Sequence, residues 1–150
     1  MNATDPLPPV LLADDDPDDR SLTGEAFRSA ALPNPLHYVT DGEKLLDYLR
    51  ECQRTSAPNC MPALILLDLN MPRIDGREAL QTIKRDPSFR AIPVVVWTTS
   101  RAAEDRQRAQ DAGCDGYVTK PSSFVEMVEL MRSIGERWLP QDREATGADT

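Results

Sequence analysis

Asp68 is the residue of this sequence whose chemistry is most evident. It follows the apolar run 63–67, which holds no charged residue, and it precedes Leu69-Asn70-Met71-Pro72. An isolated buried carboxylate is unfavourable, so an acid at this position should lie at the rim of a core with polar or charged partners. An ionised aspartate oxygen is also a nucleophile that can accept a phosphoryl group.

Three other strand-like runs are followed by side chains that could assist such a nucleophile. They are Asp14 and Asp15 after the run 10–13, Thr98 after the run 94–97, and Lys120 after the run 116–119. In an open parallel sheet, ligands bind beyond the carboxyl ends of the strands. We therefore expect these acids, the hydroxyl and the lysine to converge on one site.

The charges of this site predict a metal ion. Two unit charges about 4 Å apart repel by about 1 kcal/mol in water and about 4 kcal/mol at an effective dielectric constant of about 20. Asp14, Asp15 and Asp68 make three such pairs, and Lys120 offsets only part of the repulsion. Either one carboxyl group is protonated or a divalent cation lies among them, and oxygen ligands with room for water and phosphate suit Mg²⁺.

Strand-like and helical segments alternate along the whole chain. The expected strands lie at 10–13, 36–39, 63–67, 94–97 and 117–119. The runs 63–67 and 94–97 are continuously apolar, as central strands covered on both faces are. This alternation predicts one α/β domain with a five-stranded parallel sheet.

The helices expected between these strands have their own start and stop signals. Asp16-Pro17 predicts an N-cap followed by proline at the first helical position. Two further helices have the spacing of a capping box, Thr40 with Glu43 and Ser123 with Glu126. A helix expected at about 102–112 has little apolar surface and stops at Gly113, a favoured C-cap residue.

Composition limits the class of protein and its partners. The chain has 150 residues, a formal charge of −8 and a pI near 4.6. That charge argues against a nucleic-acid-binding surface and against anionic membranes. No apolar run approaches the ~18 residues of a membrane span, and residues 1–6 lack the layout of a signal peptide. We expect a cytoplasmic protein without nucleic-acid or membrane partners.

The cysteines and the single histidine do not predict a metal centre. Cys52, Cys60 and Cys114 form no CxxC pair, and His37 is the only histidine, so the clustered ligands of a zinc site are missing. We expect three reduced thiols and a structural role for His37.

Over residues 9–139 the chain resembles the receiver domain of two-component response regulators. The matching segments are Leu12-Ala13-Asp14-Asp15, Asp68 with Met71-Pro72 and Asp75-Gly76, 93–98, and Tyr117-Val118-Thr119-Lys120-Pro121. Each segment alone is a weak signal, but the ordered set is specific. The resemblance implies a doubly wound (βα)5 flavodoxin-like fold, a three-layer sandwich, with an extension at 1–8 and a flexible tail at 140–150.

The resemblance also implies how the site would bind its metal ion. Asp68 is the expected phosphoacceptor and a ligand of Mg²⁺, for which Mn²⁺ could substitute. Asp15 would bind the ion directly, Asp14 would bind it through water, and Asn70 would bind it through its carbonyl group.

Three further residues have expected roles in catalysis and switching. Thr98 is similar to the switch hydroxyl of the family, Lys120 to its phosphate-pairing lysine, and Tyr117 to its rotating aromatic residue. The resemblance also suggests a cis bond between Lys120 and Pro121.

A finer resemblance is to single-domain regulators associated with bacterial phytochromes and related sensor kinases. Its segments are Asp41-Gly42-Glu43, 46–49, 67–72, 96–100 and Trp138-Leu139. It implies a sensor histidine kinase as phosphodonor, with a bacterial phytochrome as the candidate. Because only a short tail follows the last helix, we expect the output to pass to a downstream protein target or a phosphotransfer protein.

The last helix, at about 123–139, predicts a homodimer. One continuous stripe can serve the domain's own core, namely Phe124, Met127, Val128, Met131, Ile134 and Trp138. Val125, Leu130 and Leu139 fall outside this stripe, and clustered apolar residues on a solvent face indicate a partner surface. A symmetric pair is the commonest such assembly.

Other interpretations fit the residues less well. A phosphatase of the haloacid dehalogenase type requires an acid two residues after the nucleophile, where this chain has Asn70. A receiver-like scaffold that works without phosphorylation would not need the full set of acids, hydroxyl and lysine. A flavodoxin-like domain with merely solvated acids, or a flavin carrier, would not explain that set at four strand ends. We predict a phosphoacceptor signalling protein that catalyses only its own phosphorylation and slow dephosphorylation, and is otherwise not an enzyme.

Overall fold

The computed structural model of the chain describes residues 7–71 and 75–139. Strands and helices alternate in the described residues as β1 (Val10–Ala13), α1 (Pro17–Ser29), β2 (Leu36–Val39), α2 (Gly42–Thr55), β3 (Leu64–Leu67), α3 (Gly76–Arg85), β4 (Val94–Thr98), α4 (Ala103–Asp111), β5 (Gly116–Thr119) and α5 (Phe124–Trp138). Most of the expected extension at 1–8 and all of the expected tail at 140–150 lie outside the described residues.

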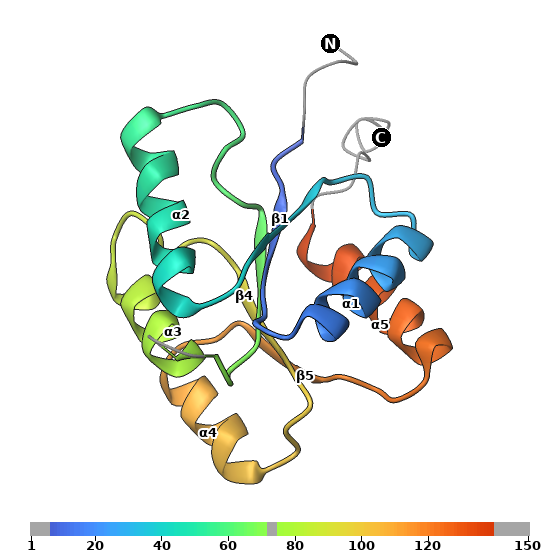
Figure 1. The fold of residues 1–150 in the computed structure, drawn as a ribbon. Coiled ribbons are helices and arrows are strands. Elements are labelled where there is room, and N and C mark those ends of the chain that lie inside the picture. Colours follow the sequence, from blue (N-terminus) through green and yellow to red (C-terminus); the bar gives the residue numbers. More distant parts are fainter. Residues whose placement is uncertain (1–6, 72–74, 140–150) are drawn as a thin grey trace, which may run out of the picture.

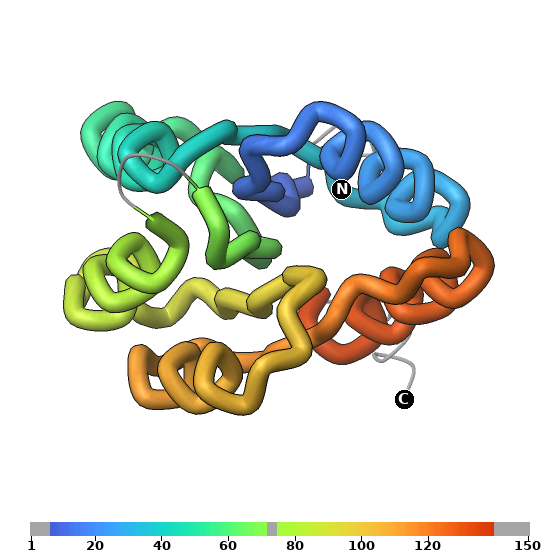
Figure 2. The backbone as a smooth tube through the Cα atoms, turned by 60° about the horizontal axis from the view of Figure 1, so that its bottom comes forward, coloured from blue at the N-terminus to red at the C-terminus, as the bar shows by residue number. Residues whose placement is uncertain are grey.

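The five strands form one parallel sheet in the order β2-β1-β3-β4-β5. Helices α2, α3 and α4 cover one face of the sheet, and α1 and α5 cover the other (Figure 1). Figure 2 looks toward the edge at which the strands end, with the two helical layers on either side. This arrangement confirms the predicted doubly wound, three-layer fold.

Alternation along the strands builds two hydrophobic cores, one on each face. In β1, Leu11 and Ala13 pack in the core beneath α2 and α3, whereas Val10 and Leu12 pack in the core beneath α1 and α5. This is the period of two that successive strand residues follow. All residues of β3 and β4 are buried, as the continuously apolar runs predicted.

The helix starts agree with the sequence signals at two of three positions. Asp16 caps α1, with Pro17 in the first turn, and Ser123 caps α5 by accepting from the Glu126 N–H. The predicted cap of α2, Thr40, is wrong. Asp41 Oδ1 accepts the Lys44 N–H at 2.8 Å, because a carboxylate one residue later reaches the first turn equally well.

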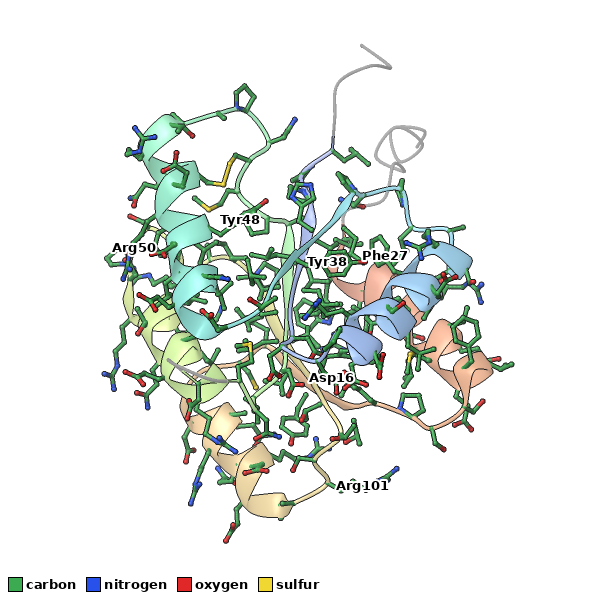
Figure 3. All side chains as sticks on the ribbon, in the orientation of Figure 1. Asp16, Phe27, Tyr38, Tyr48, Arg50 and Arg101 are labelled. Atoms are coloured by element: carbon green, nitrogen blue, oxygen red, sulfur yellow. A yellow bond between two sulfur atoms is a disulfide. The ribbon has the colours of Figure 1, made fainter. Side chains whose placement is uncertain are left out.

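The expectation of three reduced thiols is wrong for two of them. Cys52 and Cys60 form a disulfide, with their Cα atoms 5.4 Å apart, whereas Cys114 is a free, half-buried thiol. Cys52 lies near the end of α2, and left-handed backbone at Ser56 and Asn59 turns the chain back toward it. Figure 3 shows this bond at the end of the molecule opposite Asp16.

At both ends of α5, one apolar residue is buried or exposed differently from the prediction. Phe124, assigned to the core stripe, is 39% exposed, and Leu139, assigned to the solvent face, is 4% exposed. Leu139 follows the last helical residue in extended backbone, so helical spacing no longer decides where its side chain points. Val125 is 66% exposed, as predicted.

The structure also gives findings on the Lys120–Pro121 bond, on His37 and on membrane spans. The Lys120–Pro121 peptide bond is trans, so the suggested cis bond is wrong; trans is the lower-energy form for most bonds before proline. His37 lies on β2, where its Nδ1 is 2.8 Å from the Tyr48 hydroxyl. Within residues 7–71 and 75–139, no helix has the length and apolar character that crossing a bilayer would require.

Candidate functional site

The candidate site lies at the carboxyl edge of the sheet, beside the neighbouring strands β1 and β3. Asp14 follows β1, Asp68 follows β3, Thr98 ends β4 and Lys120 follows β5, and all four residues are buried. The chain leaves β1 for α1 on one face of the sheet and leaves β3 for α3 on the other (Figure 1), and ligands of open α/β sheets bind at such a point. The fold therefore brings together groups that lie up to 106 residues apart in the sequence.

The Lys120 ammonium is the centre of the site. Its Nζ is 2.8 Å from Asp14 Oδ2, 3.3 Å from Asp19 Oδ2 and 3.5 Å from Asp68 Oδ2. Its backbone N–H donates to the carbonyl of Thr98 at 2.7 Å, which fixes the start of the side chain. One cation thus faces three carboxylates.

Asp14 is the most constrained of these acids. Its residue is fully buried, and its Oδ1 accepts the backbone N–H of Asp16 at 3.0 Å while its Oδ2 faces Lys120. The Arg20 guanidinium donates to the Asp14 carbonyl at 3.0 Å, which ties the first turns of α1 to the end of β1.

Asp68 is the acid whose protonation the surroundings favour. Burial raises its pKa, and the Asn70 N–H on Oδ1 at 3.0 Å and the charge of Lys120 offset only part of that effect. Burial alone would lower the pKa of Lys120, but the hydrogen bond and charge of Asp14, then the charges of Asp68 and Asp19, raise it. The pKa of Asp68 therefore rises because burial outweighs the effect of Lys120, and the pKa of Lys120 rises because its three carboxylate partners outweigh burial.

The Asp75-Gly76 pair requires glycine at its second position, because the backbone of residues 68–69 lies too close for a side chain. A Cβ atom at this position would overlap the Asp68 carbonyl oxygen and would lie 2.6 Å from Leu69 Cα. The Gly76 N–H donates to the Leu69 carbonyl at 3.1 Å, and Asp75 caps α3 through the Glu78 N–H. The pair starts α3 directly against the backbone that carries Asp68.

Thr98 and Tyr117 meet at the backbone of Ser100. The Ser100 N–H donates to Thr98 Oγ1 at 3.2 Å, and the Tyr117 hydroxyl donates to the Ser100 carbonyl at 3.3 Å. The Arg106 guanidinium lies over the Tyr117 ring, 4.6 Å from its centroid. The two predicted switch residues therefore contact the same peptide segment.

Asp105 on α4 joins both Ser100 and α3. The Ser100 hydroxyl donates to Asp105 Oδ2 at 2.6 Å, and Arg77 Nη2 donates to Asp105 Oδ1 at 2.8 Å. These two contacts, the Ser100 hydrogen bond first, lower the pKa of Asp105. Sequence patterns gave no indication of this link, because its members belong to three segments with no common spacing.

The structure brings together only part of the predicted metal set. Asp14 and Asp68 have carboxylate oxygens within 4.8 Å of each other and of an Asp19 oxygen. The side chains of Asp15 and Asn70 are exposed, and their roles as ligands remain predictions. Asp19 was missed by the sequence analysis, although its position three residues after the cap Asp16 places it on the first turn of α1, above the end of β1.

The donor set of this site fits a hard divalent cation. Its oxygens come from carboxylates, two of them on buried residues, and Lys120 is the one ammonium that contacts them among the described residues. Carboxylate oxygens with space for water are the ligands that Mg²⁺ prefers.

Comparison with known proteins identifies the family. The model of the response regulator receiver domain matches residues 10–132. The chain is 36% identical over 143 residues to the probable methanogenesis regulatory protein FilR2 of Methanothrix harundinacea, covering 95% of this chain and 90% of that protein. It is 33% identical over 130 residues to the response regulator Rcp1 of Synechocystis sp., covering 87% and 88%.

Solved structures agree with this match. The response regulator RPA3017 in red light signalling of R. palustris is 37% identical, with a TM-score of 0.79 and coverage of 89% of this chain and 94% of that one. The phosphorylated cyanobacterial phytochrome response regulator RcpA is 36% identical, with a TM-score of 0.78 and coverage of 89% and 94%. The Mn²⁺-bound form of Rcp1 is 32% identical, with a TM-score of 0.76 and coverage of 89% and 96%. The chain therefore belongs to the response regulator receiver domain family.

Proposed function

We propose that this protein is the phosphoacceptor of a two-component relay and that Asp68 takes a phosphoryl group from a sensor histidine kinase. The observation that carries this proposal is the position of Asp68 at the carboxyl edge of the sheet, 8% exposed and beside Lys120 and Asp14. A buried acid with a raised pKa destabilises the fold, which is typical of a functional carboxylate.

The reaction is a displacement at phosphorus. A carboxylate oxygen of Asp68 forms the new bond to phosphorus, and the bond from phosphorus to the kinase's imidazole nitrogen breaks, its electron pair remaining on the imidazole. Phosphoryl transfer depends mainly on positioning and on neutralising the phosphoryl oxygens. Lys120, whose Nζ is 3.5 Å from Asp68 Oδ2, would pair with one of these oxygens, and the Thr98 hydroxyl would donate to another after turning from the Ser100 N–H.

A divalent metal ion is part of this proposal. Asp14, Asp15, Asp68 and the carbonyl of Asn70 would hold it, and bound Mg²⁺ would supply positive charge beside the phosphoryl oxygens. The Mn²⁺-bound form of the relative Rcp1 supports the choice of ion and the expectation that Mn²⁺ substitutes.

The signal would leave the site through Thr98 and Tyr117. If the Thr98 hydroxyl turns toward the phosphoryl group, the Ser100 N–H loses its acceptor, and the Tyr117 hydroxyl is bound to the carbonyl of that same residue. A local change at the phosphoryl group would thus alter the start of α4 and the ring on β5. The sparse apolar packing of α4, in which Ala109 alone is buried, favours movement of this helix.

A phytochrome-type histidine kinase is the proposed donor, and a target protein or phosphotransfer protein is the proposed acceptor of the signal. The support is that relatives similar over nearly the whole chain include a phytochrome response regulator and a regulator of red light signalling. Red and far-red illumination of such a kinase should then change the rate at which Asp68 is labelled.

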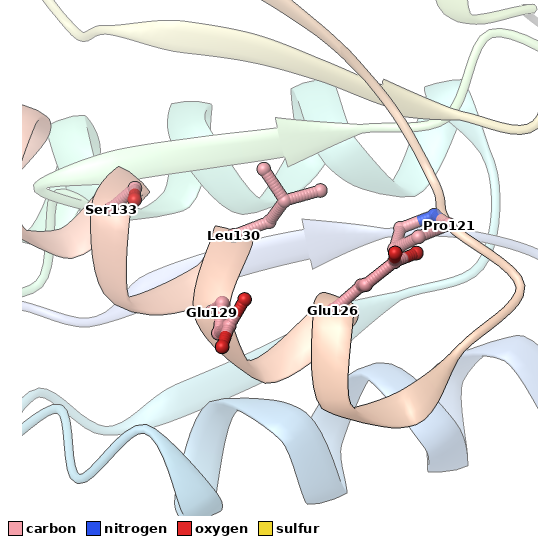
Figure 4. Close-up of a pocket in the computed structure, with 5 residues that line it drawn as sticks. All are labelled: Pro121, Glu126, Glu129, Leu130 and Ser133. Carbon is pink, nitrogen blue, oxygen red and sulfur yellow. The ribbon is translucent and has the colours of Figure 1, made fainter.

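A homodimer through α5 completes the proposal. A pocket beside this helix is lined by Pro121, Glu126, Glu129, Leu130 and Ser133 (Figure 4). Val125 and Phe124 are exposed apolar residues on the same helix. Arg101, which points away from the domain in Figure 3, and Arg108 are exposed cations near α4 that a second copy could place against the glutamates.

Phosphoryl uptake from a small acyl phosphate tests the function. The wild-type protein with Mg²⁺ should gain one hydroxylamine-labile phosphoryl group, and a chelator or the Asp68→Asn substitution should abolish the gain. Asp47→Asn, which removes an exposed acid on α2, is the matched control and should label normally. Full labelling of Asp68→Asn would contradict the proposed function.

A further inference from the structure

We propose that Asp19 is a positioning residue for the phosphoryl reaction: its carboxylate holds the Lys120 ammonium before phosphorylation and yields that place to a phosphoryl oxygen on Asp68. The inference rests on the proposed function of Asp68. It concerns an acid that the sequence patterns did not assign, because it lies on the first turn of α1 and not at the end of a strand.

The contacts of Lys120 give the reason for the exchange. An ammonium group has three N–H donors, and three carboxylate oxygens lie within 3.5 Å of Nζ, one each from Asp14, Asp19 and Asp68. A phosphoryl oxygen on Asp68 would be a further acceptor beside the same ammonium. Four acceptors would then face three N–H donors, so we expect one of the present partners to lose its contact when the phosphoryl group arrives.

Asp19 is the partner that can leave at least cost. The Asp14 side chain is fully buried, and the Asp16 N–H fixes its second oxygen, so it cannot reach water. Asp68 would carry the phosphoryl group itself. The Asp19 side chain is 38% exposed on the first turn of α1, and it contacts Nζ at 3.3 Å, so rotation takes its carboxylate into solvent.

The negative charge of Asp19 predicts how this residue affects the binding of an anion at Asp68. One Asp19 oxygen lies within 4.8 Å of an Asp68 oxygen, so Asp19 adds a negative charge close to where the anionic phosphoryl group must sit. Like charges at this distance repel, even when partly screened by water. Asp19 therefore keeps Lys120 in place in the resting site and also opposes premature occupation of the site by anions.

Beryllofluoride, an anion that mimics a phosphoryl group on aspartate, provides the test. Its dissociation constant is measured at saturating Mg²⁺ by amide NMR titration of the wild-type protein, Asp19→Asn and Asp18→Asn. Asp18 is the matched control, because it is an exposed acid on the same helical turn. We expect Asp19→Asn to bind roughly five- to tenfold more tightly and Asp18→Asn to stay within about twofold of the wild type.

Two further measurements test whether Asp19 competes directly with the anion for Lys120. The alternatives are that Asp19 acts only through its long-range charge or that it is a ligand of the metal ion. The gain in Asp19→Asn should persist at about 0.5 M salt, because Asp19 contacts Lys120 directly, whereas the fields of distant exposed charges are largely screened. Its affinity for Mg²⁺ alone should fall by no more than about threefold. Thermal unfolding of each variant verifies that it is folded.

Several outcomes would overturn the inference. Unchanged or weaker beryllofluoride binding in Asp19→Asn would do so, as would a gain that disappears at high salt. A loss of Mg²⁺ affinity by about tenfold or more without a gain for the anion would make Asp19 a metal ligand instead. If the wild type itself binds no beryllofluoride with Mg²⁺, the proposed function fails and this inference fails with it.

Discussion

The hydroxyl of Tyr117 donates a hydrogen bond to the carbonyl oxygen of Ser100 across 3.3 Å. The N–H of Ser100 donates to Thr98 Oγ1, so one residue connects the hydroxyl beside the site to the aromatic ring on β5. Ser100 is therefore the shortest route by which a change in the Thr98 hydrogen bond could reach Tyr117.

Amide exchange should report this connection. Beryllofluoride with Mg²⁺ should change exchange across residues 98–116, and Tyr117→Phe should speed exchange at the start of that segment even without the anion, because the Ser100 carbonyl loses its donor. Tyr38→Phe, at an exposed ring on β2, is the control. Identical exchange in the free and anion-bound protein would exclude this switch.

The ionisation of Asp105 should make the free energy of unfolding depend on pH in the acid range. The Ser100 hydroxyl, and then Arg77, lower its pKa below the ordinary value of 3.8. Because the pKa of Asp105 is lower in the folded state, its ionised carboxylate stabilises the fold at pH values above 3.8. This stabilisation is lost as the pH falls through the pKa of the folded state.

Unfolding by denaturant between about pH 3 and pH 6 tests the role of Asp105. The free energy of unfolding of Asp105→Asn should be lower than that of the wild type near pH 6, and the difference should shrink as the pH falls. The control Asp111→Asn alters an exposed acid on the same helix and should keep the wild-type pH dependence. A constant difference at all pH values would show that the charge of Asp105 is not responsible.

Asp68→Asn should stabilise the metal-free protein. Burial raises the pKa of Asp68 in the folded state above the ordinary value of 3.8. The free energy of unfolding therefore falls as the pH rises from 3.8 through the folded-state pKa, and this loss remains at neutral pH. Removing this charge, which faces Asp14 and Asp19, should raise the free energy of unfolding by about 1 kcal/mol at pH 7. Thermal unfolding in a chelator measures this, and a lower melting temperature than that of the wild type would contradict it.

The sequence predicted the fold because its strongest signals are local and agree with one another. The apolar runs of β3 and β4 have no alternative to a buried central position, and the polar groups at their ends must then share one edge of the sheet. Asp14, Asp68, Thr98 and Lys120 were placed correctly at that edge for this reason.

The features that sequence analysis missed depend on geometry that no short pattern encodes. The disulfide requires the turn after α2 to bring Cys60 back to Cys52, eight residues away with no CxxC spacing. Asp19 reaches Lys120 only because α1 begins directly above the strand end. Leu139 is buried because the chain leaves helical backbone at that residue.

The predicted homodimer can be measured by light scattering at micromolar concentration. We expect a dimer mass, and Leu130→Arg should reduce it to that of a monomer, because this residue lines the pocket beside α5. Phosphorylation of Asp68 should be unaffected by that change. Leu22→Arg, at an exposed leucine on α1, is the control and should remain dimeric. A monomer mass for the wild type, with and without beryllofluoride, would rule the dimer out.

The most direct test of the account is to identify the phosphorylated residue. Borohydride reduces an aspartyl phosphate to homoserine, and peptide mass spectrometry then locates the changed residue. After incubation with an acyl phosphate and Mg²⁺, we predict homoserine at position 68 and unchanged aspartate at positions 14, 15 and 19. Homoserine at one of those three positions, or none at position 68 in a protein that carries label, would contradict the account.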